Sequence, residues 1–163
     1  MTQFGVFSLF LFLHVLTAII AFGPTFIFPI IGAMSGKEPM HGNFGLRITE
    51  VIEDRVVIPF ALTMPVTGVV LIATAGFNLA DRTAWWLDIG IVLYVIALVI
   101  ALFLQRPLLH EMVHITSAPP PAGGPPGPPP GLLETAAKVR RNGAVLGILI
   151  FVIVLLMTTR PQF

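Results

Sequence analysis

The sequence predicts an all-α, polytopic membrane protein: a four-transmembrane-helix bundle with a short amphipathic interfacial helix between helices one and two. Of the 163 residues, 56% are hydrophobic and only 10% are charged, whereas about a quarter of the residues in a soluble domain are charged. The apolar residues also gather in four long runs, and about 20 apolar residues in a helix cross a bilayer. We therefore expect a single membrane domain, residues 1–163, surrounded by the lipid bilayer.

The apolar runs set the expected bounds of the spans. We place the four spans at about 4–34, 56–75, 86–104 and 143–157. The first run is longer than a bilayer requires, and Gly23, Pro24 and Pro29 predict a kink in its second half, because proline cannot donate a backbone hydrogen bond. The runs leave two longer loops, and each loop has its own pattern.

In the loop after the first span, apolar residues recur at helical spacing while Arg47, Glu50 and Asp54 fall on the opposite face. This pattern predicts an amphipathic helix on the membrane surface, with a solvated polar face. The loop after the third span contains residues 119–130, which read PPPAGGPPGPPP. Such a stretch cannot build a core and predicts a polyproline II linker.

The basic residues predict the orientation in the membrane. Loops 35–55 and 105–142 hold most of the Lys and Arg residues of the chain, namely Lys37, Arg47, Arg55, Arg106, Lys138, Arg140 and Arg141. The other side holds only Arg82 and Arg160. Because positively charged loops stay in the cytoplasm, we expect both loops there and both termini on the non-cytoplasmic side. The net charge of +1 gives no indication of a nucleic-acid partner.

The string His110-Glu111-Met112-Val113-His114 matches the H-E-x-x-H pattern of zinc metalloproteases. In such sites His110 and His114 would bind zinc, and Glu111 would activate a water molecule. Pro107 lies close before the string, and the fourth span offers no acidic residue as a third ligand. We interpret the string as a polar helix end at the cytoplasmic interface, with zinc binding as the alternative.

His14 is the one ionisable side chain deep inside an expected span, and intramembrane ionisable residues mark functional sites by default. Counted from the two ends of their helices, His14 and Met64 reach a similar depth. The pair is therefore a candidate set of axial haem ligands. The other interpretation is a structural histidine that bonds Thr63, Thr67 or Tyr94 on a neighbouring helix.

Gly143 and Gly147 form a small-residue pair in the fourth span. Such pairs let two helix backbones approach closely, either within one bundle or between two chains. The sequence leaves both alternatives open. The chain contains no cysteine, which excludes disulfides, thiolate metal sites and cysteine nucleophiles.

Four short segments carry a family resemblance: Leu13-His14-Val15, Phe22-Gly23-Pro24 followed by Phe26 and Phe28-Pro29, Glu53-Asp54-Arg55-Val56-Val57 with Pro59, and Thr67-Gly68. In these segments, over roughly residues 9–110, the chain resembles a family of bacterial membrane proteins known only as domain of unknown function 2269. The resemblance implies a four-helix protein of the bacterial plasma (inner) membrane without an assigned activity.

More distantly, a His early in the first span with a Gly and a Pro further along is similar to the copper-resistance D-type and HemJ-type protoporphyrinogen oxidase families. In the latter family the matching position implies that His14 binds haem. That family also carries polar residues in later spans, whereas the second and fourth spans here contain no His, Lys, Asp or Glu.

Three functional hypotheses follow. The leading one is a small membrane protein without an evident catalytic site, either free in the plasma membrane or packed as an accessory subunit in a larger, respiratory-type complex, with other membrane-protein subunits or further copies of the chain as partners. It rests on the lack of an internal repeat and of charged residues in the second and fourth spans. The second is a haem-binding redox protein that uses His14. The third is a zinc metalloprotease built on the H-E-x-x-H string.

Overall fold

The computed structural model describes residues 3–76, 84–117 and 127–160, and every regular element in these ranges is helical, as predicted. The α-helices are α1 (Gln3–Phe22), α2 (Phe28–Lys37), α3 (Pro39–Ile52), α4 (Ile58–Ala75), α5 (Trp85–Val99), α6 (Arg106–Ser117) and α7 (Leu132–Thr159). They are joined by the 3-10 segment η1 (Gly23–Phe26) and the π-helical segments η2 (Glu53–Val57) and η4 (Ile100–Gln105).

Four of the resulting continuous helices are long and apolar enough to cross a membrane, which confirms the predicted architecture. They cover Gly5–Lys37, Met40–Ala75, Trp85–Ser117 and Leu132–Thr159. The shortest has 28 residues, or about 42 Å at a rise of about 1.5 Å per residue. Since the hydrocarbon core of a bilayer is about 30 Å thick, the more polar ends of the helices extend beyond it.

The first long helix changes geometry at the residues where a kink was predicted. Pro24 has no N–H to continue the α-helical ladder, and the chain tightens there into η1. The Thr25 hydroxyl donates to the Phe22 carbonyl oxygen at 2.6 Å, which gives that oxygen a partner beside the bend. The helix then continues as α2.

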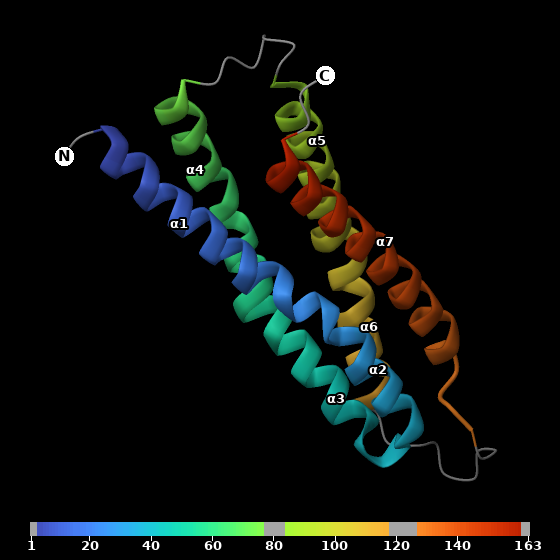
Figure 1. Ribbon diagram of the computed structural model, residues 1–163. Helices are drawn as coiled ribbons and strands as arrows, with labels where there is room; N and C mark the ends of the chain where they lie inside the picture. Colours follow the sequence, from blue (N-terminus) through green and yellow to red (C-terminus); the bar gives the residue numbers. More distant parts are fainter. Residues whose placement is uncertain (1–2, 77–83, 118–126, 161–163) are drawn as a thin grey trace.

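The helix predicted between the first two spans is present as α3, but it is not a separate element on the membrane surface. Figure 1 shows that α3 continues through η2 into α4 as one rod. The expected solvated face is instead partly an interface, because Glu50 and Asp54 pair with side chains of α6. The paired side chains stay partly exposed, since Arg106 is 46% and Asp54 27% exposed.

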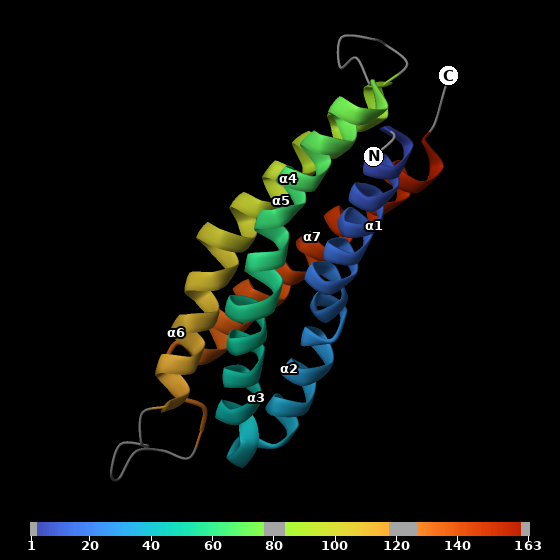
Figure 2. The same cartoon turned by 90° about the vertical axis from the view of Figure 1, so that its left-hand side faces the viewer.

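The long helices pack beside one another in a bundle (Figures 1 and 2). α1 packs along α4, α2 along α3, α3 along α6, and α5 along α7. α1 begins and α7 ends at the same end of the bundle, whereas the turn between α2 and α3 lies at the opposite end. Each long helix therefore runs antiparallel to the one that follows it in sequence.

The buried core consists largely of small and flexible side chains. Its apolar members are Ala21, Val57, Ala61, Met64, Ala84, Trp86, Leu87, Ala97, Leu109, Met112, Ile150 and Ile153. Large apolar side chains such as Phe12, Phe103 and Phe151 point outward and are exposed. In lipid this distribution is favourable, because close packing of small residues drives helix association there and outward apolar groups contact acyl chains.

The predicted polyproline linker falls mostly on residues 119–126, which lie outside the described residues. Its described end leads directly into α7. Gly131 has a positive φ of 82°, a conformation that glycine adopts without steric cost. The Thr135 N–H then donates to the Gly131 carbonyl oxygen at 3.0 Å. The basic residues before Gly143 therefore belong to the same helix as the fourth apolar run.

Candidate functional site

His14 lies half-buried between α1 and α4, where its Nδ1 is 2.8 Å from Thr67 Oγ1. The Thr67 hydroxyl has one proton to give, and the Met64 carbonyl oxygen accepts it at 3.0 Å. We therefore assign the Nδ1–H tautomer from the network, with His14 donating to Thr67. This tautomer leaves a lone pair on Nε2, for which no hydrogen-bond partner occurs within residues 3–76, 84–117 and 127–160.

Met64, the predicted second haem ligand, is buried in the same layer of the α1/α4 interface. The Thr17 hydroxyl lies 3.2 Å from the Met64 sulfur and 2.9 Å from the His14 carbonyl oxygen. Two neighbouring polar contacts therefore cross the interface, one at Thr67 and one at Thr17. The structure brings His14 and Met64 into one layer, and haem ligation by this pair stays a prediction.

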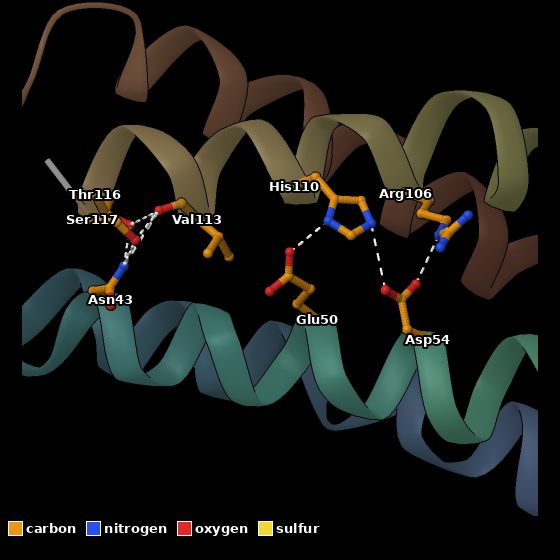
Figure 3. Close-up of polar contacts among 8 residues, drawn as sticks. All are labelled: Asn43, Glu50, Asp54, Arg106, His110, Val113, Thr116 and Ser117. Atoms are coloured by element: carbon orange, nitrogen blue, oxygen red, sulfur yellow. Dashed lines mark hydrogen bonds and ion pairs between the residues drawn. The ribbon is translucent and has the colours of Figure 1, made fainter.

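A second polar cluster joins α3 and η2 to α6 (Figure 3). Arg106 Nε donates to Asp54 Oδ1 at 2.8 Å. His110 stands between two carboxylates, with Nδ1 2.5 Å from Glu50 Oε1 and Nε2 3.5 Å from Asp54 Oδ2. An imidazolium carries an N–H on both nitrogens, so this geometry supplies an acceptor for each. The cluster holds α6 against α3 at several points.

The same interface continues toward the turn between α2 and α3 through an amide. Asn43 Nδ2 donates to Thr116 Oγ1 at 2.9 Å and to Ser117 Oγ at 3.0 Å, and the Val113 carbonyl oxygen lies 3.4 Å away. Figure 3 shows these contacts at the C-terminal end of α6, whereas the ion pairs lie nearer its start. α3 and α6 are therefore held together along their length by polar contacts.

The H-E-x-x-H residues point to different partners. His110 pairs with Glu50 as described above, Glu111 Oε1 lies 3.5 Å from the Thr135 hydroxyl of α7, and His114 is exposed. In the described part of the chain, no group of three or more His, Cys, Asp or Glu side chains is arranged to hold a metal ion. His110 therefore contacts Glu50 of α3, and Glu111 contacts Thr135 of α7.

Gly143 and Gly147 face open space, because a Cβ added at either position would meet nothing within 4 Å among the described residues. The close approaches within the bundle lie elsewhere. A Cβ at Gly90 would collide with the Met157 methyl group, and one at Gly45 with the Ser35 hydroxyl. Within the described residues, no helix of the bundle approaches this pair closely. The alternative that Gly143 and Gly147 contact another chain stays a prediction.

The sequence patterns did not single out two buried polar residues, Glu53 and Asn142, or the buried Oε1 atom of Gln105. Glu53 and Asn142 lie just before the second and fourth apolar runs, and Gln105 directly follows the third. That shared position at the polar ends of three runs is a signal in the sequence, but its meaning depends on which side of each helix faces the bundle.

The comparison with protein families matches residues 8–161 to the family described as "Predicted integral membrane protein (DUF2269)". The chain belongs to this family. The match extends beyond the expected residues 9–110, since it includes α7 and the proline-rich stretch. With four helices able to span a membrane, this family member is an integral membrane protein.

Searches of the curated proteins and of the solved structures found no match for the chain. The family description names no activity. Any function must therefore be argued from the residues of this chain.

Proposed function

We propose that the protein is a non-enzymatic accessory subunit that packs through one face of α7 against another chain in a larger membrane complex. The observation that carries this proposal is the open space beside Gly143 and Gly147. Small-residue pairs in a membrane helix permit close backbone contact. The bundle fills the space beside Gly90 and Gly45, whereas the space beside Gly143 and Gly147 is open, as it also is beside Gly32 and Gly36 of α2.

The pairing of polar groups supports a structural role. Glu50 and Asp54 contact His110 and Arg106, and these contacts join helices of the same chain. An enzyme requires polar groups that are free to act on a substrate. In the two clusters described above, most polar groups are used to hold helices together.

The test is purification in a mild detergent, followed by identification of co-purifying chains. We expect a partner chain to co-purify with the wild-type protein and to be lost from the double variant Gly143→Ile and Gly147→Ile. Val145→Phe is the matched control, because Val145 is exposed and, at about 100° per residue, lies on the side of α7 opposite to Gly143 and Gly147. Recovery of the wild-type chain alone as a monomer, or retention of the partner by the double variant, would contradict the proposal.

We further propose that the protein lies in the plasma membrane of a bacterium with both termini outside. The Lys and Arg excess of loops 35–55 and 105–142 supports this orientation. The chain has no cysteine, so single cysteines introduced at positions 2 and 162 can be labelled selectively. We expect a membrane-impermeant reagent to label them from outside intact cells, and labelling only after lysis would reverse the orientation.

A haem-binding redox protein is the second candidate, and it is favoured by the lone pair on His14 Nε2. A histidine that donates through Nδ1 and keeps Nε2 unprotonated is arranged as metal-ligating histidines commonly are. We expect a Soret absorption band in the purified protein that disappears in His14→Ala and persists in the control Thr63→Val. A preparation supplied with haem that shows no such band would contradict this candidate.

A further inference from the structure

One face of the helix formed by α3 and η2 is exposed. Phe44, Arg47, Ile48, Val51 and Arg55 stand at positions i, i+3, i+4, i+7 and i+11, which is the spacing of a single helical face. All five side chains are exposed, and the exposed fractions of Phe44, Ile48 and Val51 are 66%, 37% and 48%. We call these five residues the α3 stripe.

The α3 stripe begins outside the hydrocarbon core of the bilayer. The second apolar run, residues 56–75, has 20 residues, and these cover about 30 Å, which is the thickness of that core. The third apolar run ends at Leu104, two residues before Arg106. Since Arg106 contacts Asp54 at 2.8 Å, the two runs end at the same level. The boundary of the hydrocarbon core therefore lies close to Asp54.

Much of the apolar surface of the α3 stripe lies farther out than the lipid headgroups. At a rise of about 1.5 Å per residue, Ile48 and Phe44 lie about 9 Å and about 15 Å beyond Asp54. The headgroup layer on each side of a bilayer is only about 5–8 Å thick, so lipid covers Val51 at most. Met40, one turn before Phe44, is 95% exposed as well. Exposed apolar side chains that gather outside the membrane mark a protein interface.

The two arginines of the α3 stripe have no acidic partner in the described part of the chain. Arg47 has Glu50 one helical turn away, and Arg55 follows Asp54 directly. Both acids are engaged by side chains of α6 instead. No ion pair of Arg47 or Arg55 occurs within residues 3–76, 84–117 and 127–160. The stripe therefore carries two positive charges without a counter-ion beside its apolar side chains.

A second copy of this chain does not complement the α3 stripe. Two copies in one membrane have the same orientation, so a symmetric contact through α3 brings Arg47 and Arg55 close to the same residues of the other copy. Like charges placed together in an interface oppose association. The charge of the stripe therefore fits a different protein, one that presents carboxylates together with apolar side chains.

We propose that the α3 stripe binds an amphipathic helix of another protein, which covers the apolar side chains and pairs its carboxylates with Arg47 and Arg55. An amphipathic helix repeats apolar side chains every three or four residues, as the stripe does, so the two faces can pack along their length. Opposite charges beside the apolar contact fix the register and orientation of such a helix. This surface is separate from the docking face proposed on α7, and either can fail without the other.

The test is photo-crosslinking of the full chain in the cells that it comes from, with a benzophenone amino acid in place of Phe44. We expect a covalent adduct with one other protein, and mass spectrometry should place the crosslink on an amphipathic helix with carboxylates beside its apolar face. Arg47→Glu combined with Arg55→Glu should lower the adduct yield about tenfold, because two attractive contacts become repulsive. The same amino acid in place of Phe12, which is 61% exposed but lies inside the first apolar run, should not give this adduct.

Arg140→Glu combined with Arg141→Glu is the matched control, because it reverses two exposed charges at the same end of the bundle and should keep the adduct. Absence of an adduct at Phe44 would overturn the proposal. So would an adduct with lipid alone, with a second copy of the chain, or with a segment that lacks carboxylates, and so would an equal loss in both double variants. If a double variant does not accumulate in the membrane, the sequence of the segment crosslinked to the chain with both arginines decides.

Discussion

The contact between His14 and Thr67 permits a quantitative test of how α1 is held against α4. Thr67→Val removes the hydroxyl but keeps the branched shape of a side chain that is only 8% exposed. The packing is therefore preserved, and the loss is confined to the contact of 2.8 Å with His14 Nδ1. The bonds from Thr67 to carbonyl oxygens of its own helix matter little, because those oxygens also accept helical N–H groups.

The expected loss is about 1 kcal/mol in the free energy of unfolding. Hydrogen bonds between membrane helices contribute about 0.6 kcal/mol on average and up to about 1.7 kcal/mol. His14 is half-buried and would lose its one hydrogen-bond partner among the described residues, which places the loss above that average. Thr63→Val is the control, since Thr63 is exposed and donates only within α4, to the Phe60 carbonyl oxygen. Its expected change is below about 0.3 kcal/mol.

The assay is reversible unfolding in mixed micelles, followed by circular dichroism, for a double-mutant cycle of Thr67→Val and His14→Phe. A stabilising contact requires the double variant to lose less than the sum of the two single variants, by about 1 kcal/mol. Additive losses, or a Thr67→Val variant as stable as Thr63→Val, would show that this contact does not stabilise the α1/α4 interface.

Three further predictions concern other interfaces. Tyr94→Phe removes the hydroxyl that α5 donates to a carbonyl oxygen of α4, and unfolding should become easier by about 1 kcal/mol; an unchanged stability would contradict the contact. Asn43→Cys with Thr116→Cys should be joined across α3 and α6 by a short thiol-to-thiol crosslinker, because Asn43 Nδ2 and Thr116 Oγ1 are 2.9 Å apart, and mobility on gels reports the crosslink against each single variant. Gly90→Leu should destabilise the α5/α7 interface by about 1–3 kcal/mol, and Met157→Ala should restore part of that loss because the Met157 methyl group fills the space.

The sequence predicted the elements of this fold well, because lipid imposes a simple rule. A membrane helix must satisfy its backbone internally and present apolar side chains outward, so long apolar runs are sufficient to predict four spans. The bend at Pro24 was also predictable, since the missing N–H acts locally. The π-helical turn at Glu53 was not, because it depends on how neighbouring helices pack.

The candidate sites were less predictable, because a polar pattern does not say which kind of partner will satisfy it. The face of Glu50 and Asp54 was predicted to face water, and the string around His110 was interpreted as a polar helix end, with zinc binding as the alternative. In the structure they meet, with a carboxylate near each nitrogen of His110 and Arg106 bonded to Asp54. The two patterns are halves of one contact, and no periodicity within either helix could reveal the other half. The same reasoning applies to Glu53, whose burial depends on how neighbouring helices, among them α1, pack against η2.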